Sequence, residues 1–129
     1  MRIHHIGYAV REIGPAAAVF ESLGFVKEGE IVRDEGRAVE ILFMRNGESL
    51  IELVAPQHDG SPVVGHLRKS GSSPYHVCYE TDILATRVAA MRAEGCILVE
   101  AIREATAIGG RRVAFLYNAK IGLVELAEA

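Results

Sequence analysis

The chain has 129 residues, of which 50% are hydrophobic and 24% charged, and its formal net charge is -3. This length and composition suit one globular domain or two small fused ones, and they exclude a largely disordered chain. Lysines and arginines are scattered and form no basic stripe, so nucleic acid is excluded as a partner. No apolar run approaches the roughly 20 residues of a membrane-spanning helix, and a strand-like pattern stands where a signal peptide has its apolar core. We therefore expect a cytoplasmic protein with no membrane partner.

The first half of the chain predicts one strand, one helix and three further strands. Apolar residues alternate over 3–10 and leave His5 on the side opposite Ile6 and Tyr8, as in a half-buried strand. Gly14-Pro15 suits the first turn of a helix that Gly24 ends. Further strands are expected over 26–33, 38–45 and 49–54, with a turn at Asp34-Glu35-Gly36.

The second half predicts the same order after a short connection. Ser61-Pro62 is expected to cap a short linker helix with basic residues in its last turn. A strand over 75–81 and a helix over 83–94 follow, the helix ending at Gly95. Three more strands are expected near 97–101, 111–117 and 122–127. Cys78 and Cys96 lie in apolar segments without CxxC spacing, which indicates two core thiols.

The two halves are copies of one unit. His5-Ile6-Gly7-Tyr8 aligns with His76-Val77-Cys78-Tyr79, and Ile51-Glu52-Leu53 aligns with Val124-Glu125-Leu126 in the same order. We therefore predict an α+β fold in a single domain. Unit one covers 1–56, a linker helix lies within 57–73, and unit two covers 74–129. The two tandem β-α-β-β-β units are expected to form a curved, mainly antiparallel, cup-shaped sheet with its helices on the outside.

Strand alternation places four potential metal ligands on the concave side of that sheet. They are His5, Glu52, His76 and Glu125, at equivalent positions of the two units. Any one of these four residues alone is better explained as a structural or solvated residue. The matched set favours one shared divalent ion, because the ion compensates the charge of carboxylates that are otherwise costly to bury. Two imidazoles and two carboxylates suit Ni, Co, Mn or Fe, and Zn less firmly. Glu40 alternates with Leu42 and Met44, and the alternation assigns it to the same side.

The whole chain resembles the vicinal oxygen chelate superfamily, which includes glyoxalase I, methylmalonyl-CoA epimerase, extradiol dioxygenases and bleomycin resistance proteins. In this superfamily the four metal ligands fall at His5, Glu52, His76 and Glu125. The motifs are most similar to methylmalonyl-CoA epimerase, whereas the His-Glu-His-Glu set is similar to that of bacterial glyoxalase I. The segments that carry the resemblance are His4–Val10, Leu23–Phe25, Ile51–Pro56, Ser61–Val63, Tyr75–Val77 and Gly109–Leu116.

The resemblance implies a metal-dependent isomerase that acts through an enediolate on an acyl-CoA, as methylmalonyl-CoA epimerase does. The alternatives are a lactoylglutathione lyase acting on a glutathione hemithioacetal, a pathway-specific metalloenzyme, and a metal-free binding or resistance protein. The epimerases carry Glu-Gln-Gly before the third strand, and its Glu is taken as the base. Here Asp34-Glu35-Gly36 stands in that place, so the candidate bases are Glu35, Glu40 and a metal-released Glu125 or Glu52. Unpaired sheet edges lead us to expect a homodimer.

Overall fold

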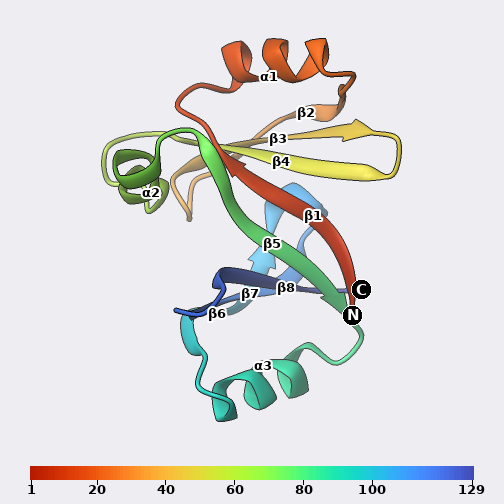
Figure 1. Ribbon diagram of the computed structural model, residues 1–129. Coiled ribbons are helices and arrows are strands. Elements are labelled where there is room, and N and C mark those ends of the chain that lie inside the picture. Colours follow the sequence, from red (N-terminus) through yellow and green to blue (C-terminus); the bar gives the residue numbers. More distant parts are fainter. The chain divides into compact units, whose positions relative to one another are not determined.

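The computed structural model describes all 129 residues, and their contacts divide the chain into two compact units. The N-terminal unit is His5–Tyr75, and the C-terminal unit is Met1–His4 together with His76–Ala129. Each unit contains a strand, a helix and three more strands, which confirms the predicted α+β class (Figure 1). In chain order the elements are β1 (Arg2–Ala9), α1 (Ile13–Ser22), β2 (Val26–Asp34), β3 (Val39–Asn46), β4 (Ser49–Pro56), α2 (Val63–Ser70), β5 (Ser73–Thr81), α3 (Leu84–Ala93), β6 (Ile97–Ala105), the 3-10 turn η1 (Thr106–Ile108), β7 (Arg111–Asn118) and β8 (Gly122–Glu128).

The two units repeat one strand arrangement. In the N-terminal unit the strands lie in the order β2-β3-β4-β1, with antiparallel β2/β3 and β3/β4 pairs and a parallel β1/β4 pair. In the C-terminal unit the order β6-β7-β8-β5 has the same sense at every pair. The pairing within each unit is therefore mainly antiparallel, as expected.

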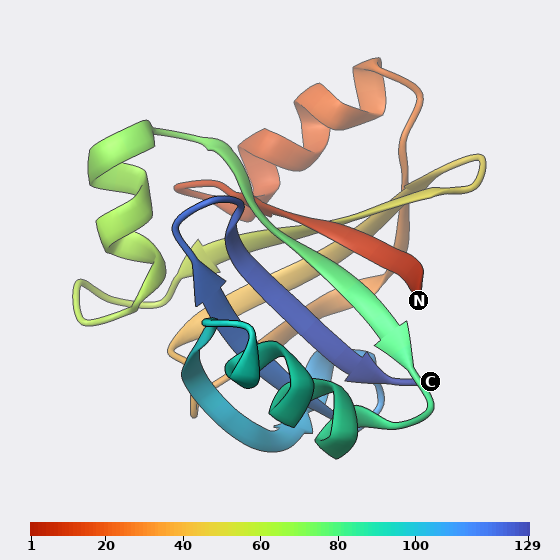
Figure 2. The same cartoon turned by 60° about the horizontal axis from the view of Figure 1, so that its bottom comes forward.

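One face of each sheet is covered by the helix of its own unit. In the N-terminal unit Ile13 and Ala17 of α1 pack against Leu42 and Met44 of β3, and all four side chains are buried. In the C-terminal unit α3 lies against its own sheet (Figure 2). Leu84 and Val88 of α3 pack there against a matching set on β7 and β8, namely Ala114, Leu116, Val124 and Leu126. Apolar residues at helical spacing on one side and alternate strand residues on the other thus build each core.

Both unit helices end in the same way, and glycine is required there. Gly24 has φ +98° and Gly95 has φ +103°, in the region that disfavours a side chain. The amide of Phe25 bonds the carbonyl of Phe20 and the amide of Gly24 bonds that of Glu21, a pairing that satisfies carbonyls at the end of the helix. Cys96 and Gly95 make the equivalent bonds to Met91 and Arg92. The two predicted helix ends are therefore confirmed.

Two local expectations need correction. Ser61 does not cap α2 with its side chain; its carbonyl accepts the amide of Val64 instead, so the first turn is satisfied by backbone. Strand β6 continues to Ala105, past the predicted end near 101, and its pairing with β7 has register shifts after Leu98 and Glu100. The two cysteines form no disulfide, and Cys78 is fully buried. None of the helices is long and apolar enough to cross a membrane.

Candidate metal centre

A buried His–Glu pair lies on the sheet face of the N-terminal unit opposite α1. Glu52 of β4 is in register with Gly7 of β1, so His5 and Glu52 lie on the same face. His5 Nε2 is 3.5 Å from Glu52 Oε1, and the two residues are 1% and 6% exposed. Phe43 is directly opposite Glu52 in the antiparallel pair, and its ring meets the His5 ring edge to face at 5.2 Å and 81°.

The C-terminal unit repeats this pair residue for residue. Glu125 of β8 is in register with Cys78 of β5, which places His76 and Glu125 on one face. His76 Nε2 is 3.2 Å from Glu125 Oε1, and the two residues are 6% and 4% exposed. Phe115 lies opposite Glu125, and its ring meets His76 at 5.3 Å and 87°. Each unit therefore holds one His, one Glu and one Phe in the same arrangement.

The two phenylalanines are the members of this arrangement that the sequence reasoning missed. Phe43 and Phe115 occupy equivalent positions of the repeat, which was the available signal. Leu42 and Met44 belong to the core beneath α1, so the intervening residue Phe43 lies on the opposite face, with Glu52.

The same alternation applies to Glu40. It pairs directly with Ala55, which lies in the core beneath α1, so Glu40 faces the helix side and not the face of Glu52. The prediction that Glu40 lines the ligand face is therefore wrong. The alternation from Glu40 to Met44 is regular, but its apolar members point to the covered face.

The turn between β2 and β3 separates two neighbouring carboxylates. Glu35 is 75% exposed in its side chain and pairs with Arg33 across 3.4 Å. Asp34 is 6% exposed and lies opposite Val39, whose alternation puts it on the face of Phe43 and Glu52. Arg37 holds Asp34 by a guanidinium bond of 2.8 Å and by a backbone amide bond of 3.1 Å. Of the two, Asp34 is the carboxylate on the ligand face.

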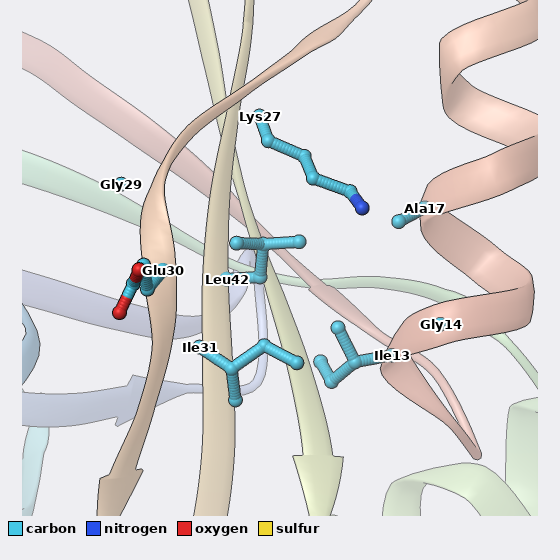
Figure 3. A pocket seen from close by; sticks show the side chains of 8 residues that line it. All are labelled: Ile13, Gly14, Ala17, Lys27, Gly29, Glu30, Ile31 and Leu42. Carbon is cyan, nitrogen blue, oxygen red and sulfur yellow. The ribbon is translucent and has the colours of Figure 1, made fainter.

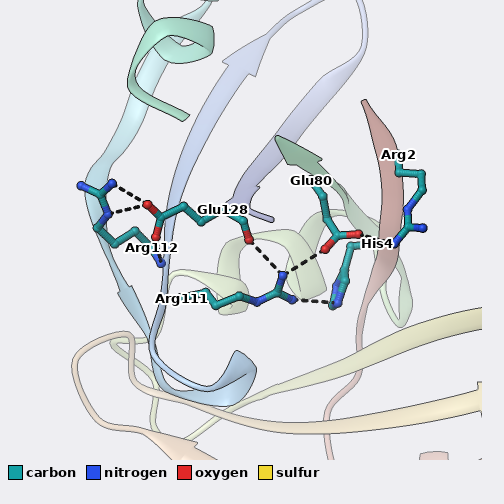
Figure 4. A network of polar contacts seen from close by, with 6 residues as sticks. All are labelled: Arg2, His4, Glu80, Arg111, Arg112 and Glu128. Atoms are coloured by element: carbon teal, nitrogen blue, oxygen red, sulfur yellow. Dashed lines mark hydrogen bonds and ion pairs between the residues drawn. The ribbon is translucent and has the colours of Figure 1, made fainter. Parts of the chain in front are cut away.

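A network of charged side chains fastens the end of the C-terminal sheet (Figure 4). Arg111 donates to Glu80 Oε2 at 3.0 Å and to the carbonyl of Glu128 at 2.9 Å, and its Nη2 lies 3.0 Å from His4 Nε2. Arg2 donates to the other oxygen of Glu80 at 3.1 Å. Hydrogen bonding from Arg111 holds the pKa of Glu80 below its ordinary value of 4.5, against the opposing effect of burial. The network ties Arg2 and His4, at the start of β1, to β5 and β7.

A separate pocket lies on the other face of the N-terminal sheet, between α1 and β2 (Figure 3). Its volume is about 250 Å³, and Ile13, Ala17, Ile31 and Leu42 form its apolar part. Beside these, the ammonium group of Lys27 points toward α1 (Figure 3). None of the four predicted metal ligands lines it, so it does not belong to the candidate metal centre.

Comparison with known proteins identifies the family. A model described as the Glyoxalase/Bleomycin resistance protein/Dioxygenase superfamily matches residues 4–115. The chain belongs to this superfamily. The mitochondrial methylmalonyl-CoA epimerase of Bos taurus is 29% identical over 133 residues, covering 99% of this chain and 74% of the relative. An ethylmalonyl-CoA/methylmalonyl-CoA epimerase of Cereibacter sphaeroides is 33% identical over 88 residues, covering 67% of this chain and 66% of the relative.

A solved structure has the same fold. The crystal structure of methylmalonyl-CoA epimerase from Mycobacterium tuberculosis has a TM-score of 0.85 at 23% identity, covering 98% of this chain and 87% of that chain. At this identity the likeness concerns the fold. The predicted resemblance is thus confirmed, and the expectation of an enzyme is confirmed by curated relatives that are themselves epimerases.

Proposed function

We propose that this protein is a metal-dependent acyl-CoA epimerase of the methylmalonyl-CoA type. The observation that carries the proposal is the His–Glu pair that occurs, buried and in the same register, in both units. The curated relatives that match the chain act on methylmalonyl-CoA or ethylmalonyl-CoA by their names, and this supports an acyl-CoA with an acidic α-carbon as substrate.

The metal ligands in this proposal are His5, Glu52, His76 and Glu125. The residues fit such an ion in kind, because imidazole nitrogen and carboxylate oxygen suit Ni, Co, Mn, Fe or Zn. They also fit in burial, since two carboxylates that are 6% and 4% exposed are costly to keep without a cation. When bound, the ion supplies a Lewis acid that stabilises the negative charge of an enediolate.

The proton at the α-carbon requires a base from the chain itself. Glu125 stays a candidate, as predicted, but in the turn we assign the role to Asp34 in place of Glu35. Asp34 lies on the ligand face of the N-terminal sheet, whereas the side chain of Glu35 is largely in solvent. The contacts from Arg37 hold the Asp34 carboxylate in one orientation, as a positioned base requires.

The test measures metal content and proton exchange on the purified protein. Protein prepared without chelator should contain one divalent ion per chain, and it should exchange the α-proton of methylmalonyl-CoA for solvent deuterium, followed by NMR. The hemithioacetal of methylglyoxal and glutathione is the parallel substrate, because a lactoylglutathione lyase would convert it. Turnover of the hemithioacetal alone would replace the epimerase proposal with the lyase. Metal-loaded protein that acts on neither substrate would indicate a pathway-specific enzyme. Protein that takes up no metal would indicate a metal-free binding protein.

The homodimer and the cytoplasmic location remain predictions of the sequence. The expected homodimer would elute from a sizing column at about twice the chain mass of 14.0 kDa.

A further inference from the structure

Both candidate histidines lie against a phenylalanine of their own unit. The ring pairs His5–Phe43 and His76–Phe115 have centroid separations of 5.2 and 5.3 Å and interplanar angles of 81° and 87°. Each Phe is also the register partner of the Glu that its His faces. The same arrangement of His, Glu and Phe therefore occurs once in each of the two units.

Each phenylalanine has two neighbours on the same strand face. Ile41 in the first unit corresponds to Val113 in the second, and Arg45 corresponds to Tyr117. Both neighbouring positions therefore change between the copies, the first from one apolar residue to another, whereas the aromatic ring that contacts the imidazole is identical. This pattern is what a role tied to the histidine predicts, whereas a general packing role would tolerate other apolar residues.

The exposure of the rings supports such a role. Phe43 and Phe115 are half-buried, whereas His5 is 1% exposed and His76 is 6% exposed. An aromatic ring packed edge to face on an imidazole fixes the plane of that ring without occupying either nitrogen. In each unit the Nε2 atom lies near its own glutamate, 3.5 Å from Glu52 Oε1 and 3.2 Å from Glu125 Oε1.

We infer that Phe43 and Phe115 are positioning residues, which hold the imidazoles of His5 and His76 in the orientation that binds the metal. The inference rests on the proposed function, since it assumes that these histidines are ligands. An aromatic pair of this geometry contributes enough to change an equilibrium constant by about two- to tenfold. We therefore expect Phe43→Leu and Phe115→Leu each to weaken metal binding by about that factor, and the double variant by about the product.

The experiment titrates chelator-treated wild type and variants with Co²⁺ by calorimetry, and records the imidazole NMR signals of the apo proteins. Phe43→Leu should shift or broaden the signals of His5 and leave those of His76 unchanged, and Phe115→Leu should do the reverse. Phe43→Tyr keeps an aromatic ring at this position and should bind Co²⁺ as tightly as the wild type. Phe20→Leu is the matched control, because Phe20 makes the same kind of contact with Tyr8, at 5.1 Å and 83°, in the core beneath α1. It should lower the melting temperature without changing the affinity for Co²⁺.

The possible results separate this inference from the proposed function. If the wild type binds Co²⁺ and the two leucine variants bind it equally well, the positioning role is refuted and the metal site stands. If Phe20→Leu weakens binding as much as they do, loss of stability explains the effect and the inference also fails. A wild-type protein that binds no divalent ion would overturn both the proposed function and the positioning role.

Discussion

The replacement of Glu125 by Gln tests whether the buried pairs are metal ligands or plain ion pairs. The substitution keeps the size of a side chain that is 4% exposed and removes its charge, 3.2 Å from His76 Nε2. Without metal the change removes both the desolvation penalty of the carboxylate and its interaction with His76, and the melting temperature in EDTA measures their difference. With metal the change removes a ligand. Even residues that only support a ligand typically change metal affinity by about 10–100-fold.

The expected magnitude follows from the linkage between binding and stability. At a free metal concentration of 100 times Kd, the ion stabilises the folded wild type by about 2.7 kcal/mol. A 100-fold weaker variant at the same concentration retains only about 0.4 kcal/mol. For a chain of this size, a loss of about 2.3 kcal/mol corresponds to roughly 10 °C in melting temperature.

The assay is thermal unfolding of wild type and Glu125→Gln, each in EDTA and in the same excess of Co²⁺. The wild type should melt roughly 10 °C higher with the metal, and the variant should show almost no difference. Glu52→Gln should behave in the same way if both pairs share one ion. A variant that keeps the full metal-dependent rise would remove Glu125 from the ligand set, and a rise of half the size in each single variant would indicate a separate ion at each pair.

Two further predictions concern stability. The pKa of Glu80 is lowered in the folded protein, so its interactions with Arg111 and Arg2 stabilise the fold above the ordinary value of 4.5 and are lost as the pH falls through the lowered pKa. Glu80→Gln should therefore reduce the free energy of unfolding by about 1–3 kcal/mol at pH 7, and urea titrations should show the gap to wild type closing in acid. Gly95→Ala places a side chain at φ +103° and should lower the free energy of unfolding by about 1–2 kcal/mol in the same titrations. The cost comes from the backbone conformation, because a Cβ at this position would meet no atom within 4 Å. An unchanged urea midpoint would contradict the role of this glycine in ending α3.

The fold could be predicted because the sequence contains two copies of one unit. A helix or strand that is ambiguous in one copy is supported by the other, and Gly24 and Gly95 mark the two helix ends independently. The alternation also predicted that His5 and Glu52 share a face, as the register of β1 with β4 shows, and Glu52 lies between Ile51 and Leu53 of the helix-side core.

The errors have a common physical cause. Strand alternation tells which residues share a face but does not tell which face is covered, and strand β3 carries apolar residues on both. Glu40 and Phe43 were therefore exchanged between the faces. The base remains untested at both Glu35 and Asp34. The burial of Asp34 could not be predicted, because burial in a turn depends on the partner strand and on Arg37, which no local pattern reveals.

The proposed ligands occupy equivalent positions of the two units, but the proposed base has no equivalent, and such a difference suits a two-base epimerisation. In that mechanism one group removes the α-proton on one side of the carbon and a second group returns a proton on the other side. Asp34 lies opposite Val39, whereas the equivalent position in the C-terminal unit is Ala105, opposite Arg111.

If Asp34 serves one side only, Asp34→Asn should slow deuterium exchange into one epimer of methylmalonyl-CoA by about 10²–10⁴-fold. The other epimer should still exchange with retention, but it should no longer invert. The measurement follows each purified epimer separately by NMR, with Glu35→Gln as the control that leaves both rates near wild type and metal analysis to exclude loss of the ion. Equal loss of exchange from both epimers in a fully loaded variant would show that Asp34 does not distinguish the two sides, and full retention of both rates would remove it from the reaction.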